Sequence, residues 1–109
     1  MITDVKYPEW EPLPGEGVVD VEGKVFLDEP GIGLAMLRFR PRASIPDHAS
    51  ETDCWVVCVE GRGFTRVGDA EEEIRAGQKV FWPKGIRHGL WTADREMTTL
   101  MVHPLGFTA

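Results

Sequence analysis

The chain has 109 residues, with 12 lysines and arginines against 18 aspartates and glutamates, so its formal net charge is −6. This length suits one domain, and so acidic a chain lacks the basic surface by which proteins bind nucleic acids or anionic membranes. Because no apolar run approaches the roughly 20 residues of a membrane-spanning helix and the first twenty residues do not resemble a secretory signal, we expect a cytoplasmic protein.

Most predicted elements are short strands separated by turns that contain glycine or proline. Residues 1–16 are proline-rich and predict an irregular arm, which we expect Tyr7 and Trp10 to pack onto a single domain over residues 17–109. No segment has the apolar period of a helix. Nine or ten strands are expected in total, the clearest of them over residues 18–22, 24–27, 32–40, 54–59, 64–67, 71–74, 79–82, 88–92 and 97–103.

Two turn signals set the expected strand ends. Pro41 is expected to end the third strand, and Pro46 bars a central strand around it. The glycines of Glu60–Gly63 predict a turn, with residues 64–67 returning as a new strand. Short strands with regular turns are typical of a β-sandwich or barrel, and a closed barrel is favoured because it removes exposed edges.

Cys54 and Cys58 are the only cysteines and lie on one predicted strand. Residues four apart on a strand are ~13 Å apart, whereas a disulfide needs Cα atoms within about 7 Å. We therefore expect two reduced thiols, as in a cytosolic protein. Cys58 is expected in the core; Cys54 is either a second core residue or a metal ligand.

His48, His88 and His103 are the only histidines. The polar turn at residues 49–53 can bring His48 and Cys54 to adjacent strands. Imidazole nitrogen and thiolate sulfur suit Zn²⁺, and two histidines with one cysteine and an open position resemble a catalytic zinc or a copper site. The alternative is that the histidines line a pocket and hydrogen-bond each other, water or a ligand.

A family resemblance emerges from the segment GQKVFWPKGIRHGLWT. It resembles the second motif of the cupin family, in which Gly, Pro, Gly and His follow at fixed spacing. Gly77, Pro83, Gly85 and His88 match that spacing, and Thr92 stands where the family has Asn.

The first cupin motif is matched only in part. Gly61 fits its final glycine, which puts Cys54 at the position of the family's metal-binding Glu, Ser50 at its second His and His48 at its first His. A typical cupin binds one divalent ion through three His and one Glu, so this chain keeps two of the four ligands.

The resemblance implies an all-β double-stranded β-helix, the cupin jelly-roll barrel, and a homodimer. The candidate metal ligands are His48, His88 and Cys54, with zinc favoured if Cys54 is a ligand; iron, manganese, nickel and copper remain open. Ser50, Trp82 and His103 are candidate pocket residues, although packing is the default role of the tryptophan.

The sequence leaves three functions open. The first is a metal-dependent enzyme in which the ion polarises a small oxygen-bearing substrate or activates O₂ or water. The second is a metal-free cupin that binds or senses a small molecule without turnover, which the loss of two ligands favours. Association with a partner protein is a third possibility, because one fold hosts many functions.

Overall fold

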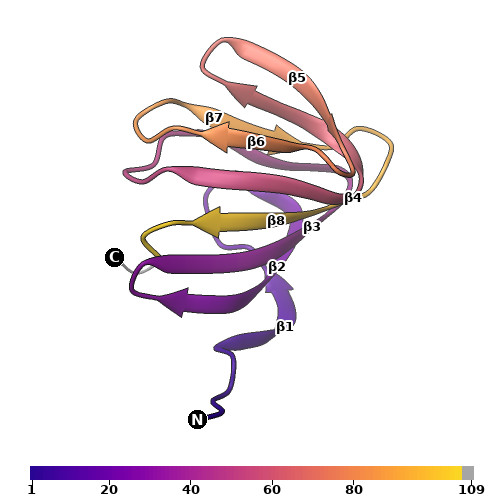
Figure 1. The fold of residues 1–109 in the computed structure, drawn as a ribbon. Coiled ribbons are helices and arrows are strands. Elements are labelled where there is room, and N and C mark those ends of the chain that lie inside the picture. Colours follow the sequence, from indigo (N-terminus) through magenta and orange to yellow (C-terminus); the bar gives the residue numbers. More distant parts are fainter. Residues whose placement is uncertain (107–109) are drawn as a thin grey trace.

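The computed structural model describes residues 1–106, which form eight strands and no helix (Figure 1). The predicted all-β class is confirmed. Within these residues there is accordingly no helix that could cross a membrane. The strands are β1 (Tyr7–Pro12), β2 (Val19–Glu29), β3 (Ile32–His48), β4 (Cys54–Val67), β5 (Ala70–Arg75), β6 (Lys79–Trp82), β7 (His88–Trp91) and β8 (Met97–His103).

Two long strands, β3 and β4, close the barrel. The first half of β3 pairs with β8 and its second half with β7. Likewise, β4 pairs with β8 and β6 before it pairs with β7 and β5. The ring β3–β7–β4–β8 is therefore continuous, and Figure 1 shows β8 lying between β3 and β4. This arrangement is the jelly roll that the family resemblance implied.

The predicted breaks within these strands are wrong. β3 continues through Pro41, which lies between the part of β3 that pairs with β8 and the part that pairs with β7, and through Pro46, which lies at a register shift. Neither proline therefore withholds a needed N–H from the ladder. Glu60–Gly63 is not a turn but a bend inside β4, where Gly61 adopts a φ of 74° and the strand changes partners. β2 also runs unbroken through Gly23, so fewer and longer strands form than expected.

Thr92 holds the bend of β3 in place. Its Oγ1 donates to the carbonyl of Arg40 at 2.6 Å and accepts from the N–H of Ala43 at 3.0 Å. Its own N–H donates to the carbonyl of Ala43 at 3.0 Å. Next to it, Arg42 has a φ of 58°. At the position where the cupin motif has Asn, threonine thus satisfies backbone groups that the bend removes from the ladder.

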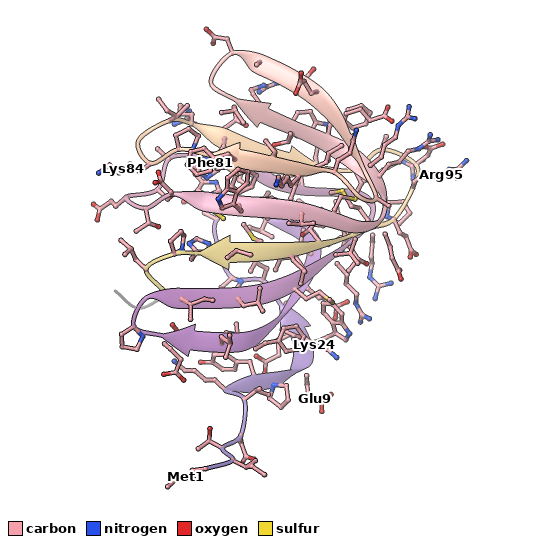
Figure 2. All side chains as sticks on the ribbon, in the orientation of Figure 1. Met1, Glu9, Lys24, Phe81, Lys84 and Arg95 are labelled. Carbon is pink, nitrogen blue, oxygen red and sulfur yellow. The ribbon has the colours of Figure 1, made fainter. Side chains whose placement is uncertain are left out.

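The N-terminal arm is more ordered than expected. Within residues 1–16, β1 forms an antiparallel edge strand on β2, and its prolines are tolerated because the outer edge needs no donors. The ring of Trp10 lies between Lys24 Nζ at 4.8 Å and Arg38 Cζ at 4.4 Å. Figure 2 shows Lys24 near Glu9, a residue of β1. The division of the chain between residues 16 and 17 stays a prediction.

Apolar side chains from both halves of the barrel form a single core. Both cysteines are buried and unpaired, as expected. His88 is also buried there, with 1% of its surface exposed. The core side chains include Val21, Leu37, Phe39, Ala43, Ile45, Val56, Cys58, Ile74, Trp82, Leu90 and Met97.

Candidate functional site

A cavity of about 760 Å³ lies between the arm and the barrel. Its lining is mainly apolar, with Leu13 and Val18 from the segment after β1, Val25 from β2, and Leu37 and Ile45 from β3. Trp82 of β6 completes the barrel side of the cavity. The polar side chains of the lining are Tyr7, Glu11, Glu16, Lys24, His48 and His103.

His48, Trp82 and His103 form one part of the lining, which we call the histidine wall. His48 ends β3 and pairs in register with His88, the first residue of β7. Their ring centroids are 4.5 Å apart, and the indole of Trp82 stacks on the His88 ring at 4.1 Å. The motif spacing thus brings both histidines together, but only His48 lines the cavity; His88 lies behind it, against Trp82.

Backbone carbonyls define the proton positions of this histidine pair. Nδ1 of His48 lies 2.9 Å from the carbonyl oxygen of Pro46, and Nδ1 of His88 lies 3.0 Å from that of Ile86. A carbonyl only accepts hydrogen bonds, so each Nδ1 carries a proton. In its neutral form each imidazole is therefore an acceptor at Nε2.

Trp82 is held by a short hydrogen-bond chain. Its Nε1 donates to Thr65 Oγ1 at 3.1 Å, and that hydroxyl donates to the carbonyl of Gly89 at 2.9 Å. All three groups are buried. Trp82 therefore presents apolar ring surface to the cavity while its single polar atom has a partner elsewhere.

Cys54 pairs with His103 rather than with the other two histidines. Cys54 Sγ lies 3.4 Å from His103 Nε2. Burial raises the pKa of the Cys54 thiol to about 12 and lowers the pKa of His103. Both groups are therefore neutral near pH 7, and the thiol is a poor nucleophile as it stands.

Burial is also the main cause of a lowered pKa at His88. Loss of hydration, followed by repulsion from neighbouring His48, brings that pKa to about 4. Asp47 acts in the opposite direction, but its carboxylate is already paired with Arg66 at 3.0 Å. The imidazole of His88 is thus neutral at physiological pH.

Ser50 does not line the cavity. Its hydroxyl donates to the carbonyl of Thr52 at 3.0 Å, inside the turn between β3 and β4. The sequence did not lead us to expect that the arm forms one side of the cavity, although Leu13 between two prolines was a signal that the arm packs against the barrel. A single apolar residue in a proline-rich stretch usually packs against something.

The described residues offer two pairs of metal donors rather than one set. His48 with His88 forms one pair, and Cys54 with His103 forms the other. Across residues 1–106, no three or more His, Cys, Asp or Glu side chains gather closely enough to hold an ion. Catalytic zinc needs three protein ligands, so this donor set does not fit a metal centre of that kind.

Comparisons with known proteins agree on the fold. A family model described as "Cupin domain" matches residues 35–103. The polyketide cyclase RemF from Streptomyces resistomycificus superposes with a TM-score of 0.85 at 23% identity, covering 95% of this chain and 80% of that one. No curated protein matches.

Two further solved structures extend this likeness. An RmlC-like cupin from Shewanella frigidimarina superposes with a TM-score of 0.82 at 17% identity, covering 93% of this chain and 86% of that one. For KdgF from Halomonas sp. the TM-score is 0.77 at 15% identity, with 88% and 86% covered. At such identities the likeness concerns the fold alone.

Proposed function

The chain belongs to the cupin domain family, and on this premise we propose that its cavity binds one small organic molecule without a resident metal ion. The observation that carries the proposal is the cavity itself. Its volume of about 760 Å³ lies within the range of ligand sites, ~300–1,000 Å³. A mainly apolar lining with a few polar groups is also the usual composition of such sites.

Filling the cavity is expected to weaken this binding. Val25 lines the cavity from β2 and is only half-buried, so Val25→Trp adds bulk there without disturbing the core. The neutral fluorophore Nile red should bind saturably to the wild-type protein, and about tenfold more weakly to this variant. A fluorescence titration measures both.

Val19→Trp is the matched control for this titration. Val19 lies on the same strand, is 47% exposed and does not line the cavity. Its variant should bind Nile red as the wild type does. If the wild type does not bind saturably, or both variants weaken binding equally, the cavity is not the site.

The metal-dependent alternative requires side chains from both donor pairs to bind the same ion. Zinc, which a Cys54 thiolate would favour, would first have to displace the proton of a thiol whose pKa burial raises to about 12. His48 and His88 alone would leave half of a tetrahedral shell to water. These considerations support the metal-free proposal.

Elemental analysis tests the absence of a resident ion. Protein produced with added zinc, iron, manganese, nickel or copper is expected to carry well below one ion per chain, with no change in His48→Ala or Cys54→Ala. One ion per chain, lost in both variants, would instead support the metal-dependent enzyme and a site that joins both pairs.

We further propose that the protein is a homodimer. A continuous row of apolar residues crosses five strands in register on the outside of the barrel. In Figure 2, Phe81 lies on the side of this sheet that faces the viewer. This outer apolar face consists of Leu27, Leu34, Val102, Trp55 and Phe81 in one row, and Met36, Leu100 and Val57 in the next.

The composition of the outer apolar face supports a second copy of the chain as its partner. Lys24 and Lys79 end the second row, and no carboxylate lies in either row. Two copies, each with a net charge of −6, can therefore meet there without bringing carboxylates into contact. Trp55 and Phe81 remain 38% and 37% exposed, as suits the aromatic core of an interface.

Trp55→Glu is expected to convert the dimer to a monomer, because it would bury an uncompensated carboxylate in the apolar interface. Sedimentation velocity measures the change. Val19→Glu, an exposed position outside the face, should leave the dimer intact. A monomeric wild type would overturn the proposal.

The cytoplasmic location also remains a proposal. It is supported by the two buried cysteines, which carry free thiols, since proteins of oxidising compartments more often carry disulfides.

A further inference from the structure

We propose that the cavity selects a neutral, mainly apolar molecule that donates an O–H or N–H hydrogen bond to Nε2 of His48. This inference rests on the proposed function, because it names the chemical class of the ligand that the same cavity binds. The class follows from which polar atoms of the lining still need a partner, and from where the charged side chains lie.

His48 is the residue of the histidine wall with one ring nitrogen for which no protein partner is recorded among residues 1–106. It is exposed and lines the cavity. Its Nδ1–H is committed to the carbonyl of Pro46 at 2.9 Å. What remains is Nε2, which accepts and cannot donate while the ring is neutral. A ligand satisfies it with an O–H or N–H group, not with a carbonyl or an ether oxygen.

The other polar atoms of the histidine wall already have partners. Trp82 Nε1 donates to Thr65, and His103 Nε2 lies against Cys54 Sγ. A ligand that enters beside this wall therefore meets one acceptor within an otherwise apolar surface of Trp82, Leu37 and Ile45. This geometry calls for one donor group on an apolar body.

An ionised ligand group would find no counter-charge at the histidine wall. The carboxylates of the lining, Glu11 and Glu16, belong to the exposed arm. Lys24 directs its ammonium over the ring of Trp10, at 4.8 Å. Asp47, which flanks the histidine pair, is paired with Arg66. A carboxylate or ammonium beside His48 would thus lose hydration without compensation.

Three related probes separate hydrogen-bond donation from apolar contact and from charge. α-Naphthol carries a neutral hydroxyl, its methyl ether has the same rings without the donor, and α-naphthoate is an anion. Measured by displacement of Nile red, α-naphthol is expected to bind the wild type about tenfold more tightly than the methyl ether, the value of one hydrogen bond. α-Naphthoate should bind more weakly than either.

The preference is expected to depend on His48. In His48→Phe the ratio between α-naphthol and its methyl ether should fall to about one, while Nile red still binds. Tyr7→Phe is the matched control, because it removes a polar group of the cavity lining other than His48. It should leave the ratio of α-naphthol to methyl ether affinity unchanged. Circular dichroism confirms that each variant is folded.

The outcomes distinguish this inference from the proposed function. If Nile red binds in the cavity but the wild type treats all three probes alike, or prefers α-naphthoate, the ligand class is wrong and the binding function stands. A preference that persists in His48→Phe, or disappears in Tyr7→Phe, also overturns the inference. Failure of Nile red and every probe to bind would refute both.

Discussion

Gly61→Ala is expected to lower the free energy of unfolding by about 3 kcal/mol or more. Gly61 adopts a φ of 74° at the bend of β4, a conformation that residues with a Cβ rarely adopt. The added methyl would also collide with the carbonyl oxygen of Glu96, a backbone atom that cannot rotate away. The bend would have to open, and β4 could no longer pair with both β8 and β7.

Urea unfolding of the variant measures this loss, and Gly77→Ala provides the matched control. Gly77 has a φ of 89°, but a methyl group added there would meet no atom within 4 Å. The control should therefore lose only the cost of backbone strain, about 1 kcal/mol. Equal losses in the two variants would mean that the contact with Glu96 is irrelevant to stability.

Acidification is expected to destabilise the protein through His88. Burial and the neighbouring His48 lower the pKa of His88 from 6.5 to about 4 in the folded chain. As the pH falls below 6.5, His88 therefore takes up a proton in the unfolded chain but stays neutral in the folded chain. The free energy of unfolding should decrease by on the order of 2–3 kcal/mol by about pH 4, and His103 should contribute in the same direction.

Urea unfolding at about pH 7 and about pH 4.5 tests this linkage. In His88→Phe the difference between the two pH values should shrink by most of that amount, since phenylalanine keeps the stack on Trp82 but cannot titrate. His103→Phe, which removes the other histidine whose pKa burial lowers, should retain the larger part of the difference. An unchanged pH dependence in His88→Phe would refute the assignment.

The features that could be predicted from sequence are those with a local or strictly spaced signature. Alternating apolar residues identified the β class, and the family resemblance carried by Gly77, Pro83, Gly85 and His88 implied the jelly roll. Counting back from Gly61 gave His48 the first His position of the other motif, and the structure pairs that residue with His88.

The bends of the long strands and the partner of Cys54 could not be predicted, because they depend on contacts that local patterns do not encode. Pro41 and Gly61 are turn signals in isolation, yet each lies where a long strand bends from one half of the barrel to the other. The pairing of Cys54 with His103 follows from the register that sets Trp55 opposite Val102. Nothing near Cys54 in the sequence defines a register with a strand so distant along the chain.

Part of the cavity lining lies outside the segment that the family model covers, which bears on how ligand preference differs between relatives. The family model covers residues 35–103, but Tyr7, Leu13, Val18 and Val25 of the lining precede it. Under the binding function proposed above, two relatives that share every motif residue would bind different molecules where their arms differ. Exchange of residues 7–25 between them would then transfer the arm side of the cavity, while the barrel motifs and the histidine wall stay in place.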